Sequence, residues 1–467
     1  MSTNSPTHAP LPEKSALHFP NGFLWGAATS SYQIEGDRGG RGANVWDAFC
    51  LRPGATVNGD TGDVACDHLR LMADDVKLMA DLGLRSYRFS FAWPRVLPDG
   101  VGAASASGLA QYHRLVDLLL EHDIEPVPTL FHWDLPQALE DRGGWRAREC
   151  TWWFAEYAAL MVREFGDRIE RWATLNEPWC YAFLGHASGV HAPGLTDPAA
   201  AIAVAHHLML GHGRAIEAMR SLRELSIGTV LNPAPVHRDD SIDDDDVRRI
   251  DGTLNRLFLD PILLGRYPLD VLDDLGPLAL CIEDGDEAII GQEIDWLGVN
   301  YYNDHHYRLA SSPEIASPGA TPSPHITAPH TAPLVIDRPM TDIGWPVTPQ
   351  GFEDLLVRLE RDYGDALVPL YITENGAAYT DPVIDGECHD PRRLDYLDAH
   401  LRALHAAIER GVDVRGYFAW SLFDNFEWAQ GYEQRFGLVH VDYDTQVRTP
   451  KSSARWYAEV CRSNSVG

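Results

Sequence analysis

The chain has 467 residues, of which 45% are hydrophobic and 10% aromatic, so it carries enough apolar side chains for a large core. That composition excludes an intrinsically disordered, collagen-like or small disulfide-bonded protein. Asp and Glu outnumber Lys and Arg by 68 to 38, giving a net charge of −30. This charge argues against nucleic acid or an anionic membrane as a partner, because both are bound through Lys and Arg.

Apolar runs rich in β-branched and aromatic residues alternate along the chain with helical patterns. Leu69, Met72, Val76 and Met79 recur at helical spacing, and Gly83 supplies a stop signal for that helix. The other predicted helices cover about 109–121, 151–165, 198–220, 247–259, 349–363 and 391–410. The predicted strands cover 23–29, 85–91, 125–131, 171–176, 226–232, 294–301, 370–374 and 414–422.

Strands that alternate with helices predict a parallel sheet, and eight such units predict a closed barrel. An open doubly wound sheet would instead carry a Gly-rich phosphate loop after its first strand, whereas SSYQIEG follows here. The expected fold class is therefore α/β, a single (β/α)8 TIM barrel with long loops on the catalytic face. We expect residues 1–18 to form a polar, disordered tail and residues 19–460 to form the barrel domain.

Two segments depart from the alternating pattern. Residues 311–333 are rich in Pro, Ser, Thr and Ala and follow the sixth strand, where a barrel has its catalytic face. This segment is either a rim loop that shapes the pocket mouth or a tolerated insertion, and we expect a mobile rim loop. The acidic run 243–246 is expected to begin a helix rather than to bind a metal, because carboxylates are favourable at the positive end of a helix dipole.

The sequence shows no targeting signal. Its N-terminal residues are polar and Pro-rich, without the apolar stretch of a signal peptide, and no apolar run is long enough to cross a membrane. The seven cysteines are scattered and odd in number, which is typical of a reducing compartment rather than of a disulfide framework. We therefore expect a cytoplasmic protein.

Polar and aromatic residues stand where the predicted strands end, which is where barrel enzymes place catalytic groups. Most of these side chains can hydrogen bond to a hydroxyl, and an arrangement of this kind is typical of a basin for a polyhydroxylated ligand. In chain order they are Gln33, Arg88, His132, Trp133, Asn176, Glu177, Asn232, Asn300, Tyr301, Tyr302, Glu374, Asn375 and Trp420.

Two of the strand-end residues are acids. Glu177 ends the fourth strand and precedes Pro178, and Glu374 ends the seventh. On a closed barrel these two carboxyl groups face each other across the mouth, as glycoside hydrolysis requires: one protonates the leaving oxygen, and the other attacks the anomeric carbon or activates water. The alternative is that each acid only pairs with an arginine such as Arg88. The Asn beside each acid and the surrounding aromatic residues favour catalysis.

The same residues carry a family resemblance. The sequence resembles glycoside hydrolase family 1, the β-glucosidase family, from about residue 19 to residue 457. The motifs are FLWGAATSSYQIEG (23–36), YRFSFAWPRVLP (87–98), TLFHWDLPQAL (129–139), TLNEPW (174–179), GVHAPG (189–194), GVNYY (298–302), YITENGAA (371–378) and GYFAWSLFDNFEWAQGYEQRFGLVHVDY (416–443).

The resemblance implies Glu177 as general acid/base and Glu374 as nucleophile, with Arg88 and Tyr302 supporting the nucleophile. The mechanism would be retaining, with carboxyl groups about 5–5.5 Å apart. We expect Arg88 and Tyr302 to favour the Glu374 anion, whose charge would raise the pKa of Glu177. The expected substrate-binding residues are Gln33, His132, Trp133, Asn176, Asn300, Tyr302, Trp345, Trp420, Glu427 and Trp428.

From this resemblance we expect a retaining, exo-acting β-glucosidase that acts on cello-oligosaccharides and on aryl or alkyl β-glucosides. We also expect β-galactosidase and β-fucosidase side activities. Glu427 disfavours 6-phosphorylated sugars, because a carboxylate would repel the phosphate. The acid at position 177 separates the chain from the myrosinase branch, which has Gln there. A sugar-binding protein without turnover and a predominantly transglycosylating enzyme are the alternatives.

No cofactor and no metal are expected, because Glu, Asp and His do not cluster at ligand spacing. The expected partner is a small-molecule β-glycoside. The 14 tryptophans divide into sugar-facing residues and core residues. We expect Trp46, Trp152, Trp153 and Trp456 in the core. His186 follows the fourth strand, and we expect it to pack or cap locally rather than to border the outer channel.

Overall fold

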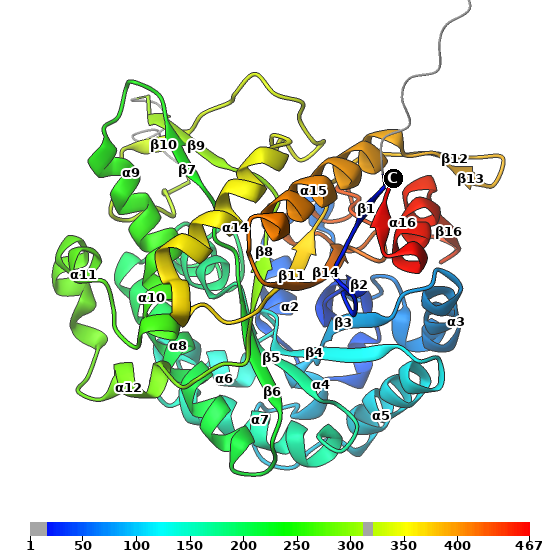
Figure 1. The fold of residues 1–467 in the computed structure, drawn as a ribbon. Helices are drawn as coiled ribbons and strands as arrows, with labels where there is room; N and C mark the ends of the chain where they lie inside the picture. Colours follow the sequence, from blue (N-terminus) through cyan, green and yellow to red (C-terminus); the bar gives the residue numbers. More distant parts are fainter. Residues whose placement is uncertain (1–15, 312–320) are drawn as a thin grey trace, which may run out of the picture.

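The computed structural model describes residues 16–311 and 321–467. Eight parallel strands close into a barrel in the order β2–β3–β4–β5–β6–β8–β11–β14 (Figure 1). Their bounds are β2 (Leu24–Ala28), β3 (Ser86–Ser90), β4 (Glu125–Phe131), β5 (Arg171–Asn176), β6 (Ser226–Leu231), β8 (Trp296–Asn300), β11 (Leu370–Asn375) and β14 (Val414–Trp420). The predicted (β/α)8 TIM barrel is confirmed.

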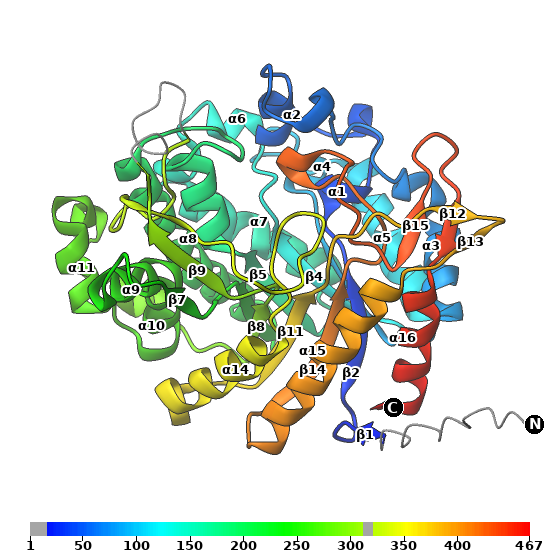
Figure 2. The same cartoon turned by 90° about the horizontal axis from the view of Figure 1, so that it is seen from above.

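Helices surround the barrel on its outside (Figures 1 and 2). The long ones are α3 (His68–Asp81), α5 (Ala106–Glu121), α7 (Cys150–Phe165), α8 (Pro198–Arg220), α14 (Pro349–Tyr363), α15 (Pro391–Glu409) and α16 (Ser452–Ser463). Shorter elements are α1 (Ser31–Ile34), α2 (Val45–Cys50), α4 (Trp93–Val96), α6 (Gln137–Glu140), α11 (Leu269–Leu275), α12 (Asp286–Ile290), β12 (Val383–Ile384), β13 (Glu387–Cys388), β15 (Val439–Val441) and β16 (Arg448–Pro450).

The predicted helix over 247–259 is two helices joined by a wider turn. α9 (Asp244–Asp251) and α10 (Leu257–Leu264) flank a π-helical turn at Gly252–Arg256. The Asp243 side chain caps α9 by accepting from the backbone N–H of Asp246, whose own side chain bonds back to the N–H of Asp243. The acidic run therefore begins a helix, as predicted, and its carboxylates lie at the positive end of the helix dipole.

The predicted rim loop over 311–333 is partly a strand. β10 (Thr331–Pro333) pairs antiparallel with β9 (His305–Leu309), which pairs in parallel with β7 (Val236–Arg238) (Figure 1). The expectation of an irregular loop is wrong for these residues, because pairing with β9 overrides their weak strand propensity. Residues 312–320 lie outside the described residues.

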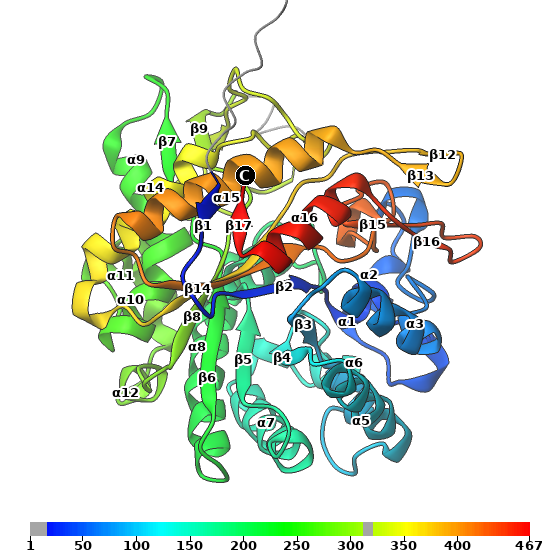
Figure 3. The same cartoon turned by 45° about the vertical axis from the view of Figure 1, so that its right-hand side comes forward.

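A strand near the start of the described residues pairs with one near their end. β1 (Leu17–His18) and β17 (Ser465–Val466) pair antiparallel and lie side by side in Figure 3. This pair lies outside the predicted domain range of 19–460. Residues 1–15 of the predicted tail lie outside the described residues. Within the described ranges, no helix combines the length and the apolarity that crossing a bilayer requires.

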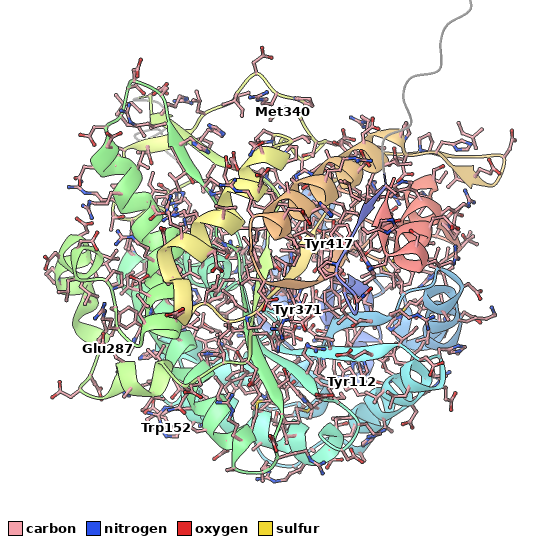
Figure 4. All side chains as sticks on the ribbon, viewed as in Figure 1. Tyr112, Trp152, Glu287, Met340, Tyr371 and Tyr417 are labelled. Carbon is pink, nitrogen blue, oxygen red and sulfur yellow. The ribbon has the colours of Figure 1, made fainter. Side chains whose placement is uncertain are left out.

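Tryptophans fill much of the core but not every position that was expected there. Trp46 is fully buried, as predicted, whereas Trp152 is 44% exposed. Figure 4 shows Trp152 at the edge of the molecule, and the Arg214 guanidinium lies 3.8 Å from its ring centroid. Its prediction as core is wrong because α7 presents Trp152 to solvent, where the cation covers the ring face. Trp153 and Trp456 are partly buried against the core.

Candidate active site

A cavity with a volume of about 580 Å³ opens at the carboxyl ends of the barrel strands. That volume suits a small-molecule ligand. The predicted residues that line it are His132, Trp133, Glu177, Asn300, Tyr302, Trp345, Glu374, Trp420, Glu427 and Trp428. The structure therefore brings ten of the thirteen predicted site residues to one cavity. Gln33, Arg88 and Asn176 lie behind this wall and bond to it.

Glu374 is held by two donors. Arg88 Nη1 lies 2.6 Å from one carboxylate oxygen of Glu374, and the Tyr302 hydroxyl donates to the other at 2.7 Å. Arg88 and Glu374 are both almost completely buried. A buried carboxylate that pairs with a guanidinium and accepts a hydrogen bond on its second oxygen is stabilised as the anion. Arg88 and Tyr302 thus fix both carboxylate oxygens of Glu374 at the cavity floor.

Glu177 lies in a different environment. It follows β5, its backbone φ is +44°, and Asn300 Nδ2 donates to its carboxylate at 2.7 Å. Burial, followed by the negative charge of Glu374, raises the pKa of the Glu177 carboxyl to about 8. At neutral pH Glu177 is therefore protonated. Environments that separate the protonation states of two acids are the physical basis of acid and nucleophile roles in glycoside hydrolysis.

A network of buried amides joins the two acids. Asn176 Oδ1 accepts from Arg88 Nη2 at 2.7 Å and from Asn300 Nδ2 at 3.1 Å. The Asn176 amide nitrogen lies 3.1 Å from His132 Nε2. Burial and the positive charge of Arg88 hold the pKa of His132 well below its usual range, so the ring is neutral at pH 7. These contacts fix the side chains that face the cavity between the acids.

Glu427 and Gln33 form a second polar group. Gln33 Nε2 donates to the Phe426 carbonyl at 2.9 Å and lies 3.4 Å from Glu427 Oε2, while Gln33 Oε1 accepts from Ser30 at 2.6 Å. Burial raises the pKa of the Glu427 carboxyl to about 8, and the charges of Glu374 and Glu177 add to this. The Glu427 carboxyl has capacity left for hydroxyl groups of a ligand.

Aromatic rings form the wall around these acids. The Trp133 and Trp428 ring centroids are 4.7 Å apart, and His132 is stacked with Trp420 at 5.9 Å. Trp133 and Trp428 have positive φ, as does Glu177, and a left-handed conformation costs about 1–3 kcal/mol at a non-glycine residue. Strain of this kind concentrates at ligand sites, where the surrounding structure enforces it.

Comparison with known proteins gives the family of this chain. The model of the Glycosyl hydrolase family 1 matches residues 15–466. The chain belongs to this family. It is a glycoside hydrolase of the β-glucosidase type, as are the relatives that it resembles over nearly their whole length.

Among these relatives, thermostable β-glucosidase B of Thermobispora bispora is 49% identical over 96% of this chain and 92% of its own. The bifunctional β-D-glucosidase/β-D-fucosidase of Bifidobacterium breve is 44% identical over 96% of this chain and 99% of its own. The crystal structure of the psychrophilic β-glucosidase of Micrococcus antarcticus superposes with a TM-score of 0.92, at 46% identity, and covers 96% of this chain and 98% of that one.

Some contacts of this family 1 site were not predicted. Asn425 Oδ1 lies 3.3 Å from Gln33 Nε2, and Phe436 packs against both Trp345 and Tyr302. Asn425 and Phe436 both fall inside the quoted motif at 416–443, but no strand-end position marks them. His186, in contrast, bonds to the Tyr181 carbonyl at 3.1 Å and is fully buried, so its predicted local packing is confirmed.

The rim of the family 1 pocket comes from outside the barrel. The cavity is lined there by the last residue of β10, Pro333, and by the three residues that follow it, Leu334, Val335 and Ile336. Met340, labelled in Figure 4, belongs to the same wall. Within the described part of the chain, His237, Asp304 and His306 also lie close together at this rim.

Proposed function

We propose that this chain is a retaining, exo-acting β-glucosidase that releases terminal β-D-glucosyl residues from cello-oligosaccharides and from aryl or alkyl β-glucosides. The observation that carries the proposal is the asymmetry between its two cavity acids. Glu374 accepts from Arg88 and Tyr302, whereas burial and the charge of Glu374 raise the pKa of Glu177 to about 8. One acid is thus ready to attack and the other to donate a proton.

In the first step, a carboxylate oxygen of Glu374 attacks the anomeric carbon while Glu177 gives its proton to the departing glycosidic oxygen. A covalent glycosyl-enzyme forms and the alcohol leaves. Esterification removes the charge of Glu374, so the pKa of Glu177 falls and Glu177 becomes a base. It then takes a proton from water, whose oxygen attacks the anomeric carbon and releases the sugar and the Glu374 carboxylate.

Other polar groups are positioned to hold the sugar during these steps. Asn176 lies beside Glu177, and its amide would bond the 2-hydroxyl, an interaction that strengthens in an oxocarbenium-like transition state. Gln33, His132 and Glu427 would bond the remaining hydroxyls of the terminal unit. Support for this comes from the hydrogen bond of Gln33 to Glu427 and from the stacking of His132 on Trp428, the residue after Glu427.

Aromatic side chains would supply apolar contacts for the sugar rings. Trp420, Trp428 and Trp133 would face the C–H edges of the terminal unit, and Trp345 would support the leaving group. We expect β-galactosidase and β-fucosidase side activities, because one carboxylate reads the 4- and 6-hydroxyls with little geometric selectivity. The bifunctional Bifidobacterium breve relative is consistent with the fucosidase activity.

We place the enzyme in the cytoplasm, where it would take part in carbohydrate metabolism and cellulose degradation by hydrolysing small glycosides. All seven cysteines are free thiols, which suits a reducing compartment. We propose one domain with no cofactor and no metal in the catalytic step. Activity should therefore survive dialysis against a chelator.

The stereochemistry of the product tests the mechanism directly. Proton NMR during hydrolysis of an aryl β-glucoside should show the β-anomer of glucose first, with the α-anomer appearing only by mutarotation. An α-anomer at the earliest times would contradict the retaining mechanism.

Absence of turnover on a panel of aryl β-glycosides and cello-oligosaccharides would favour the sugar-binding alternative. If the products formed at a high concentration of an added alcohol or sugar acceptor contain more new glycoside than free glucose, the transglycosylating alternative would be favoured.

A further inference from the structure

A second group of chemically active side chains lies at the rim of the cavity, outside the catalytic acids. His237 is on β7, His306 is on β9, and Asp304 immediately precedes β9. In the parallel pairing of the two strands, His237 is directly opposite His306, so both imidazoles project from the same face of the sheet. One ligand atom from each of the three side chains lies within 4.8 Å of the other two.

One of the three separations already fits coordination of a single ion. His237 Nε2 is 3.3 Å from Asp304 Oδ2, and the two imidazole rings are stacked with centroids 4.6 Å apart. Zinc bonds to imidazole nitrogen and carboxylate oxygen are about 2.0–2.2 Å long, so two ligands in a tetrahedral site are about 3.3 Å apart. The His237–Asp304 pair therefore already has the spacing of two zinc ligands.

Asp304 is oriented for this contact by the residues around it. Its Oδ1 accepts from the Tyr301 hydroxyl at 2.7 Å, and its backbone N–H donates to Thr348 Oγ1 at 2.9 Å. Oδ2 is therefore the oxygen that faces His237. Outer hydrogen bonds that fix a carboxylate in this way are a regular feature of metal sites, because they orient the ligand before the ion arrives.

His306 supplies an independent sign of a missing partner. Its Nε2 is buried and has no hydrogen-bond partner among the described residues. Buried polar atoms are usually bonded to protein or to ordered water, so one without a partner calls for an occupant. The positive charge of Arg338 also acts on this ring. Asp304 supplies the negative charge that favours a cation between the two imidazoles.

We propose that His237, Asp304 and His306 bind one divalent transition-metal ion of the zinc type at the rim of the cavity. Two imidazole nitrogens and one carboxylate oxygen suit Zn²⁺, whereas Mg²⁺ and Ca²⁺ prefer oxygen ligands alone. Three protein ligands leave a fourth position for water. Asp304 and His306 also line the cavity, so the bound ion forms part of its entrance wall.

Calorimetric titration of the whole, untagged chain with ZnCl₂, after chelator treatment and dialysis, tests the proposal. The wild type should bind one equivalent of Zn²⁺. Enzyme loaded with Co²⁺ instead should show the visible absorption of four-coordinate Co²⁺ and should lose it when a chelator is added. His237→Ala, Asp304→Asn and His306→Ala should each weaken binding by at least the roughly 10–100-fold that loss of an outer partner causes. Tyr301→Phe should weaken it by about 10-fold.

His389→Ala is the matched control, since His389 pairs with Glu387 at 3.1 Å in a well-exposed position away from the rim. It should bind Zn²⁺ as the wild type does. The His237 side chain is 46% exposed, so His237→Ala should keep its thermal unfolding midpoint and its rate on an aryl β-glucoside without metal. No saturable binding, or binding unchanged in all three ligand variants, would overturn the proposal. Catalysis without metal is measured separately, so the glucosidase proposal stands or falls independently.

Discussion

The floor and the rim of the cavity are built in different ways. At the floor, Arg88, Asn176 and Glu374 are 0%, 1% and 3% exposed, and each makes at least two hydrogen bonds to neighbouring side chains. At the rim, Val335 is 80% exposed and follows the short strand β10. The floor is fixed by the register of the barrel, whereas the rim depends on pairing between inserted segments. We expect the chemistry to depend on the floor and the selection of leaving groups to depend on the rim.

The largest expected effect comes from removing the charge at the floor. Glu374→Gln keeps the shape of the side chain but removes the nucleophile, so kcat on an aryl β-glucoside should fall by about 10⁴-fold or more. Steady-state rates give the measurement, with Glu353→Gln on α14 as a control. Unchanged activity would eliminate Glu374 as the nucleophile.

Glu177→Gln should have a smaller effect that depends on the leaving group. General acid catalysis contributes about 10²–10⁴-fold, and a leaving group that departs as a stable anion does not need the proton. The loss of kcat/KM, which reports the step in which the leaving group departs, should therefore be large for cellobiose and smaller for a dinitrophenyl glucoside. Equal losses on both substrates would contradict the acid role.

The pH profile should report the Glu177 proton. Glu177 must be protonated to act as the acid, and its pKa is raised to about 8, so kcat/KM should fall as the pH rises through that value. The Asn300 hydrogen bond favours the Glu177 anion and lowers its pKa. In Asn300→Ala the alkaline limb should therefore move to higher pH. A shift to lower pH would contradict this assignment.

The smallest effect is expected at the rim. Val335→Ala changes an exposed side chain, and such changes usually stay within about 0.5 kcal/mol, so kcat on an aryl β-glucoside should change by no more than about 2-fold. KM for cello-oligosaccharides should rise more than KM for the aryl substrate, because only the longer ligand reaches the rim. A large loss of kcat in Val335→Ala would contradict the expectation that the rim acts on substrate selection and not on the chemical step.

The sequence predicted the floor better than the rim for a physical reason. The strands are continuous buried runs whose pattern is local, and a barrel places their ends together whatever the loops do. This is why Glu177, Asn300 and Glu374 could be assigned to one cavity beforehand. Proximity of Asn425 to Gln33 depends on the fold of the loop after β14, which has no periodic pattern.

Outside the barrel, tertiary contacts decide the outcome. The strand at Thr331–Pro333 exists because β9 is available to pair with it. The helix expected over 247–259 is interrupted by the wider turn at Gly252–Arg256. His237 and His306 are far apart in the sequence, so only the alignment of β7 with β9 brings their imidazoles together.

The pairing of β1 with β17 has a practical consequence. β1 and the C-terminal end lie near the start of β2 (Figure 2). The cavity, in contrast, is lined by residues at the carboxyl ends of the barrel strands. An enzyme attached to a solid support or to another domain through Gly467 therefore turns its entrance toward the solution. Placement of such an anchor at the segment after β10 would instead crowd the entrance.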